Sequence, residues 1–144
     1  MQWTDDENAG FTDGTPWLAM NPNYRQINVR EQEVRTDSVL AYYRRLVHLR
    51  KADAYRETFT YGIFEPAYQE MADVFAYYRV SGESGQRILV AANFGTDAVS
   101  LPLAYPCRQV LLSNLRAESA VETACEKANA LTLESCEVAV IELG

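Results

Sequence analysis

The stretch VFAYYRVSGESGQRILVAANF, residues 74–94, decides the fold class of this chain. Two apolar runs, VFAYYRV at 74–80 and RILVAANF at 87–94, flank the turn-rich SGESGQ. Aromatic and β-branched residues favour extended strands, and a Gly- and Ser-rich interval favours a loop between them. The pattern therefore predicts a β-hairpin with a longer connecting loop.

Further short β-like runs lie on both sides of this hairpin. In VSLPL, residues 99–103, alternate apolar residues share one face, and Pro102 lacks an amide donor, which predicts an edge strand. Other predicted strands are QVLLSN (109–114), NALTL (129–133), EVAVIEL (137–143) and part of TFTYGIFE (58–65). Short strands without intervening helices predict a mainly β fold, an antiparallel sandwich or barrel. We expect its core to contain Val74, Ala76, Ile88, Val90, Leu101, Val138 and Val140.

Upstream of the strands, RTDSVLAYYRRLVHLRK (35–51) predicts an amphipathic helix. Its apolar residues recur at the spacing of one helical face: Val39, Tyr42, Tyr43, Leu46 and Val47. Thr36 or Asp37 is expected to cap the first turn. His48 lies beside the apolar face, and we interpret it as an ordinary boundary residue because no carboxylate or nucleophile is spaced to work with it.

Residues 1–36 show no regular periodicity, although they contain Trp3, Phe11 and Trp17. Large aromatic side chains left in water forgo roughly 1.5–3 kcal/mol each that burial would recover. We therefore expect this segment to dock on a scaffold rather than to behave as a flexible leader.

Length and charge exclude several classes of protein. With 144 residues the chain is one ordinary domain, whereas a complete (β/α)8 barrel needs about 250 residues. The formal net charge of -7 disfavours binding to nucleic acid or to anionic membranes. The acidic residues are scattered, so solubility is the plainer interpretation of the charge.

No apolar run is long enough to cross a bilayer, and the first residues lack the pattern of a secretory signal, so we expect a cytoplasmic protein. Cys107, Cys125 and Cys136 form no CxxC pair, and we expect them to be reduced and partly buried. With His48 the only imidazole in the chain, we expect no metal and no cofactor.

Few motifs carry chemistry. No phosphate-binding glycine loop and no G-x-S-x-G sequence is present. The run Asp5–Glu7 offers paired acids for glycoside chemistry, but consecutive acids in a loop more often form a solvated turn. Four tyrosines offer a sugar-stacking platform, although tyrosines in strands are more often half-buried: Tyr61, Tyr68, Tyr77 and Tyr78.

The order of these blocks resembles the α-glucosidases of the α-amylase family of glycoside hydrolases. The nearest group contains oligo-1,6-glucosidase, dextran glucosidase, trehalose-6-phosphate hydrolase and sucrose isomerase. The resemblance lies in MQWTDDENAGFT (1–12), PWLAMNPNY (16–24), INV (27–29), DSVLAYYRRLVHLRK (37–51) and the 74–94 hairpin. It is weakest after Cys107.

The resemblance implies that residues 1–52 are the last loop and helix of a catalytic barrel, and that 53–144 form a C-terminal Greek-key β-sandwich. In relatives the aspartate nucleophile, the glutamate acid/base and a second aspartate precede the MQW segment, so no catalytic residue is assigned to this chain. Gln2 and Trp3 are the candidates for the rim of the substrate site. Thr4 stands where the family commonly has aspartate.

The function implied is that of a supporting domain of an α-glucosidase acting on short α-glucosides such as isomalto-oligosaccharides, inactive by itself. Its expected partner is the catalytic barrel of the parent enzyme, with a homodimer through the first 52 residues when the chain is isolated. Two alternatives remain open at this point, a free-standing carbohydrate-binding module and a protein-interaction β-domain.

Overall fold

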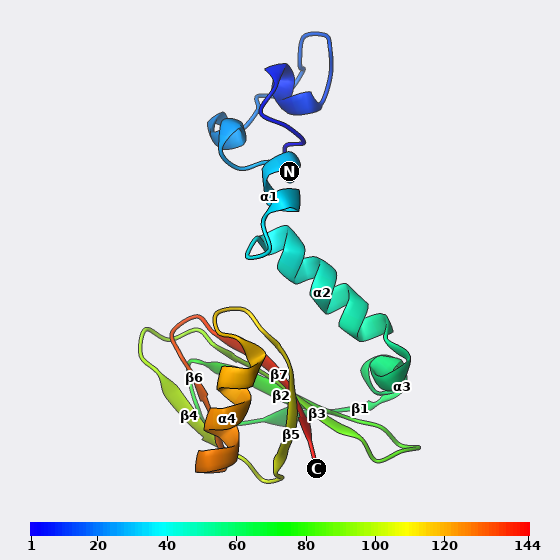
Figure 1. The fold of residues 1–144 in the computed structure, drawn as a ribbon, viewed down its shortest axis with the longest axis vertical. Coiled ribbons are helices and arrows are strands. Elements are labelled where there is room, and N and C mark those ends of the chain that lie inside the picture. The colour runs from blue at the N-terminus through cyan, green and yellow to red at the C-terminus, as the bar shows by residue number, and fades with distance from the viewer. The chain divides into compact units, whose positions relative to one another are not determined.

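The computed structural model describes residues 1–144, which form two compact units, Met1–Val47 and His48–Gly144. The first unit contains two short 3₁₀ turns, Glu7–Gly10 and Pro22–Arg25, the helix α1 (Val29–Val34) and most of α2 (Val39–Lys51) (Figure 1). The second contains two further helices and all of the strands. No helix is long and apolar enough to span a membrane.

The first unit is more ordered than its sequence suggests, because Asn28 is the N-cap residue of a short helix, α1. Its side-chain oxygen accepts a hydrogen bond from the Glu31 amide at 2.8 Å, and its Nδ2 donates to the Tyr24 carbonyl at 2.8 Å. Asn28 is buried, so both bonds are sheltered from water. The prediction that residues 1–36 are irregular is therefore wrong for Val29–Val34.

The predicted helix at 35–51 is confirmed as α2, but its cap differs from the prediction. Ser38 accepts a hydrogen bond from the Ala41 amide at 3.1 Å, the position of an N-cap oxygen. Asp37 instead forms an ion pair with Arg35 at 3.0 Å. No residue of α2 is buried, and Val39 and Tyr43 on its predicted apolar face are exposed.

The second unit is built on a five-stranded antiparallel sheet in the order β1-β2-β3-β7-β5. The strands are β1 (Ile63–Ala67), β2 (Val74–Val80), β3 (Arg87–Asn93), β5 (Cys107–Ser113) and β7 (Val138–Leu143). A two-stranded sheet pairs β4 (Val99–Pro102) with β6 (Ala130–Leu133). The 74–94 hairpin is confirmed, since β2 and β3 pair along their whole length.

Two helices lie in the region where strands alone were predicted, one before the first strand and one between β5 and β6, which contradicts that prediction. They are α3 (Asp53–Tyr61) and α4 (Glu118–Ala128). In α4 only Val121 and Cys125, one turn apart, are buried. The strand expected within 58–65 begins only at Ile63, because residues 58–61 form the last turn of α3.

Gly62 makes the junction between α3 and β1. A Cβ at this position would collide with the Thr58 carbonyl oxygen and would lie 3.0 Å from the Val80 carbonyl oxygen. The Gly62 amide donates to that same Thr58 carbonyl at 3.1 Å. The junction between the helix and the sheet therefore requires glycine, because there is no room for a side chain at this position.

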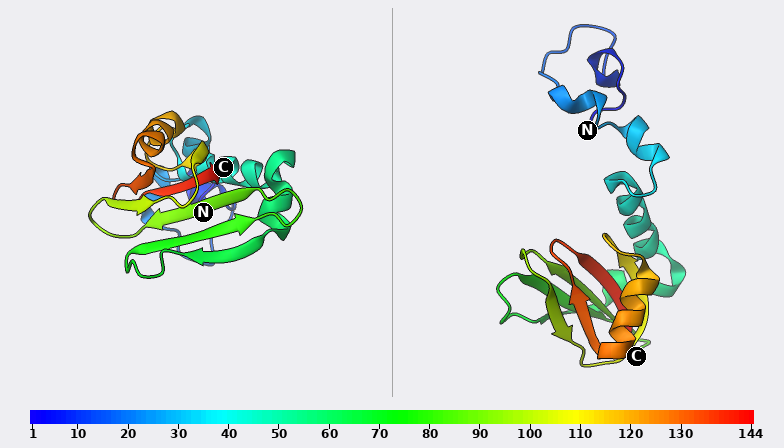
Figure 2. Two further views of the ribbon diagram at one scale, coloured as in Figure 1. Left: turned by 90° about the horizontal axis from the view of Figure 1, so that it is seen from below. Right: turned by 60° about the vertical axis from the view of Figure 1, so that its left-hand side comes forward.

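The hydrophobic core lies between one face of the large sheet and a layer made by β4, β6 and α4 (Figure 2). Ala76 and Leu101 belong to it as predicted. Val74 packs against it, and Ile88 and Val140 are buried as predicted, but on the opposite face of the sheet. On β3 and β7 the main cluster instead contains Leu89, Ala91, Ala139 and Ile141, and the predicted Val90 and Val138 are only half-buried on that opposite face. Both strands are apolar on both faces, and alternation therefore could not identify the core face.

Candidate functional site

Gln2 and Trp3, the predicted rim residues, are held by the backbone of the first turn of α1. The Val29 amide donates to the Gln2 carbonyl at 2.9 Å, and the Arg30 amide donates to the Trp3 carbonyl at 3.0 Å. The Asn28 cap that starts α1 therefore also fixes the first residues of the chain.

A tight turn on the other side completes the support of Trp3. The Trp3 and Thr4 amides both donate to the carbonyl of buried Ala9, at 3.0 and 3.2 Å. Asn8, Ala9 and Gly10 all have left-handed backbone angles, with φ of 56°, 53° and 72°. A left-handed alanine costs of order 1 kcal/mol, so the surrounding hydrogen bonds must hold this turn in place.

The two side chains are presented differently. The Gln2 Nε2 donates to Asn23 Oδ1 at 2.9 Å, which fixes the orientation of its amide. The Trp3 side chain is about half exposed, at 54%. The structure thus offers an oriented amide next to an accessible indole, both carried by a well-anchored backbone.

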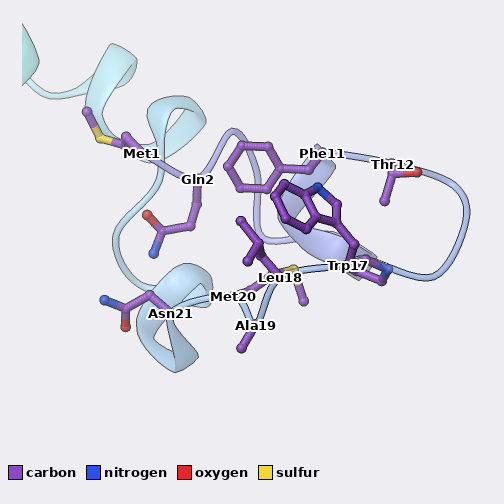
Figure 3. A pocket seen from close by; sticks show the side chains of 10 residues that line it. Met1, Gln2, Phe11, Thr12, Trp17, Leu18, Ala19, Met20 and Asn21 are labelled. Carbon is purple, nitrogen blue, oxygen red and sulfur yellow. The ribbon is translucent and has the colours of Figure 1, made fainter.

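An apolar hollow of about 490 Å³ opens beside Gln2 (Figure 3). Its walls come from residues 1–2, 11–12 and 16–21, and the apolar ones include Met1, Phe11, Trp17, Leu18 and Met20. Trp3 does not line it. Phe11 and Trp17 remain 55% and 89% exposed, so the aromatic segment has not found full cover within this chain.

Asp5 and Asp6 are not arranged as a pair of glycosidase acids. Both bind the Arg30 guanidinium, at 2.9 Å from Asp5 Oδ1 and 2.7 Å from Asp6 Oδ2. Hydrogen bonds from Arg30 and Thr4 lower the pKa of Asp6. A general acid needs a raised pKa, which is the opposite of what Arg30 does to Asp6. We therefore interpret the two carboxylates as structural partners of the Arg30 guanidinium.

The four tyrosines do not form one platform. Tyr77 and Tyr78 are neighbours on β2 and point to opposite faces of the sheet. Tyr68 donates its hydroxyl to the Pro102 carbonyl at 2.7 Å, while Tyr61 lies at the end of α3.

A different aromatic group does gather on the sheet face away from the core. The Tyr77 ring lies 4.9 Å from the Phe64 ring and 5.7 Å from the Phe75 ring, measured between centroids. Phe64 and Phe75 are half exposed. We call these three residues the outer aromatic cluster. Sequence reasoning missed it because its members come from β1 and β2, whose pairing was unknown.

No group of three His, Cys, Asp or Glu side chains is placed to hold a metal ion. His48 is exposed in the last turn of α2. All three cysteines are free thiols.

The sequence of this chain is similar to that of known glycosidases. The family described as "Alpha amylase, catalytic domain" matches residues 1–62. An oligo-1,6-glucosidase of Parageobacillus thermoglucosidasius is 36% identical over 126 residues, and a glucan 1,6-alpha-glucosidase of Streptococcus pneumoniae is 37% identical over 122. Each match includes 85% of this chain but 22% of the relative, so the chain spans about a fifth of the length of these relatives.

The fold of this chain is also similar to that of part of a solved structure. The crystal structure of an isomaltulose synthase from Klebsiella sp. LX3 superposes with a TM-score of 0.82 at 32% sequence identity. The superposition covers 99% of this chain and 24% of the synthase.

Proposed function

Because the chain belongs to the α-amylase family, we propose that it is the C-terminal supporting portion of an α-glucosidase that acts on short α-glucosides. In this proposal residues 1–52 are the last loop and helix of the catalytic barrel. Residues 53–144 are the C-terminal domain, a Greek-key β-sandwich in which the five-stranded sheet faces the β4–β6 pair.

One observation carries the proposal. The match to the catalytic-domain family ends at residue 62, and the next residue, Ile63, begins β1. All of the strands therefore lie beyond the match, while α3, which we assign to the C-terminal domain, lies within its last ten residues. This supports a junction between the end of a barrel and a separate supporting domain.

The chemistry of the whole enzyme would require groups from outside this chain. A retaining glycosidase uses two carboxylates about 5 Å apart, one as nucleophile and one as acid and then base. Here Asp5 and Asp6 are both ion-paired to Arg30. The chain would contribute the rim instead, where the Gln2 amide hydrogen-bonds a sugar hydroxyl and the Trp3 indole offers an apolar face to a pyranose ring.

The same proposal explains the exposed aromatic residues. Phe11 and Trp17 in the first unit and the outer aromatic cluster in the second leave large apolar side chains in water. Contiguous exposed patches of this kind mark protein interfaces. The partner we propose is the catalytic barrel of the parent enzyme.

The test exchanges the matching segment of the P. thermoglucosidasius oligo-1,6-glucosidase for this chain. We expect the chimera to hydrolyse isomaltose, and the 144-residue chain alone to release no glucose above the buffer rate. In the chimera, Trp3→Ala should lower kcat/KM about tenfold or more, as expected when one positioning contact is lost, while the matched Tyr61→Ala should have little effect. Turnover by the isolated chain that disappears in Asp5→Ala or Asp6→Ala would contradict the proposal.

The alternative of a carbohydrate-binding module draws support from the outer aromatic cluster alone, since exposed rings stack on sugars. Titration of the chain with isomaltose, maltose or dextran separates the two functions. The supporting-domain proposal expects no saturable change in tryptophan fluorescence or amide chemical shifts. Saturable binding that is lost in a folded Tyr77→Ala variant would favour the alternative.

A further inference from the structure

Cys107 and Cys125 come from two elements that pack together at one edge of the large sheet. Cys107 is the first residue of β5, the outermost strand, and Cys125 lies in α4. Figures 1 and 2 show α4 next to β5. Cys125 is fully buried within the core, and Cys107 is partly buried against the same core.

Two hydrogen bonds set the alignment of α4 on β5. Glu118 Oε1 accepts from the Ser113 amide at 3.4 Å, and Glu122 Oε2 accepts from the Val110 amide at 3.0 Å. From Glu118 to Glu122 the helix advances by four residues, and the bonded residue of the strand moves three positions toward the N-terminus, from Ser113 to Val110. The next step of this series places Glu126 opposite Cys107, so that Cys125, the preceding residue of α4, lies near Cys107, and both cysteines pack with the same core cluster.

We propose that Cys107 and Cys125 are a site of reversible oxidation, at which a small-molecule disulfide such as oxidised glutathione converts the two thiols into a disulfide that fastens α4 to β5. This inference concerns the second unit alone and does not depend on the proposed function.

The chemistry balances in two exchange steps. The more accessible Cys107, as thiolate, attacks one sulfur of oxidised glutathione, forming a mixed disulfide and releasing the first glutathione thiolate. Cys125 then loses its proton and attacks the Cys107 sulfur, and the second glutathione thiolate leaves. Both leaving groups take up protons. Two protein thiols are oxidised to one disulfide, and one molecule of oxidised glutathione is reduced to two thiols.

The surroundings of the pair make this exchange slow at neutral pH. Burial raises the pKa of Cys125 to about 12 and also raises the pKa of Cys107. The charged groups facing them are Glu122 and Glu126 on α4, which oppose thiolate formation, and Arg116, which favours it at Cys125. Because the thiolate is the nucleophile, the rate should rise about tenfold per pH unit between neutral pH and pH 9.

The experiment treats the full chain with oxidised glutathione at pH 9, alkylates the remaining thiols and maps the peptides by mass spectrometry without reduction. We expect a Cys107–Cys125 crosslink, lost on adding dithiothreitol and unchanged in Cys136→Ser, whose thiol is exposed and lies outside the core cluster. In Cys125→Ser, we expect the reaction to stop at a glutathione adduct on Cys107.

A second measurement, the melting temperature, uses only the wild-type chain and so does not depend on whether a variant folds. The oxidised wild-type chain should melt at a higher temperature than the reduced chain, because the crosslink closes a loop in the unfolded state. The proposal is overturned if glutathione modifies only Cys136, if any crosslink involves Cys136, or if Cys107 and Cys125 stay fully alkylatable in the folded wild-type chain.

Discussion

At the scale of single residues, the Glu137 carboxylate is the centre of a buried hydrogen-bond network in the second unit. It is fully buried and receives hydrogen bonds from Arg116 Nε at 2.9 Å, Arg116 Nη2 at 2.7 Å, the Ser113 hydroxyl at 3.0 Å and the Glu134 amide at 2.8 Å. Arg116 also donates to the Thr132 carbonyl at 2.6 Å. One carboxylate thus ties together β5, β6 and the start of β7.

Glu137→Gln should be strongly destabilising, because it removes the charge that compensates partly buried Arg116 and leaves an amide donor facing donors. Breaking one member of a buried pair costs about 3–5 kcal/mol, and we expect a loss in the lower part of that range. Urea unfolding measures it. The exposed Glu83→Gln is the matched control and should change the free energy of unfolding by less than about 0.5 kcal/mol. Equal midpoints for both variants would show that the network contributes little.

The same network predicts how stability depends on pH. Burial acts to raise the pKa of Glu137, but hydrogen bonds from Arg116, the Glu134 amide and Ser113 outweigh it and lower the pKa below the ordinary 4.5. The folded state therefore binds this proton less readily than the unfolded chain. The stabilisation is complete above pH 4.5 and is lost as pH falls through the folded pKa. Thermal melts from pH 6 to 3 should show a shallower decline for Glu137→Gln than for wild type.

At the scale of elements, α4 has a role beyond covering the core. Its glutamates satisfy backbone amides on the outer side of β5, which has no strand beyond it. At the other end of the sheet, β1 carries Pro66, which has no amide hydrogen to offer. Both edges are therefore unsuited to pairing with a further strand.

Glu122→Ala tests the edge-capping role of α4. Alanine keeps the helix propensity high, so the change isolates the bond to the Val110 amide, and we expect a loss of about 1 kcal/mol. Hydrogen exchange at the Val110 amide should accelerate. Glu126→Ala, on an exposed part of the same helix, is the control and should leave that amide protected. If both variants exchange alike, solvent rather than Glu122 satisfies the amide.

The elements differ in how well sequence predicts them, for physical reasons. The β2–β3 hairpin and α2 carry their own local signals, a turn between apolar runs and an apolar helical face. By contrast, α4 begins after Ala117, which has no side chain able to cap it, so no helix-start signal marks this element. The core faces of β3 and β7 were missed because apolar residues occupy both sides. Gln2 and Trp3 came from family resemblance, whereas the ion pairs of Arg30 with Asp5 and Asp6 join residues about 25 positions apart and have no local signal.

At the scale of the whole molecule, the exposed apolar side chains of the first unit decide how the isolated chain behaves. Trp3, Phe11, Trp17, Val39 and Tyr43 are each at least half exposed. Burying such surface gains roughly 25 cal/mol per Å². The family resemblance predicted from the sequence is confirmed, and with it comes the expectation that these residues face another body of protein.

The 144-residue chain should therefore self-associate through its first 52 residues when no partner is present. Sedimentation at micromolar concentration should show a dimer or larger species, and the 54–144 fragment should sediment as a monomer with a cooperative melt. Trp17→Ser should weaken the association, while Tyr61→Ser, also exposed but outside the interface, should not. A monomeric full-length chain whose tryptophans are shielded from quencher would contradict this prediction.

Gly62 has a consequence for the modularity of the fold. The passage from α3 to β1 runs through a single position that the Thr58 and Val80 carbonyls leave too narrow for a methyl group. A recombination event that grafted the β-unit onto a different helix would succeed only if this glycine, and the helical turn that abuts it, travelled with the graft. The smallest transferable unit therefore begins at α3, one helix before the first strand. A chain cut at Ile63 would lack both Gly62 and the helical turn that contacts it.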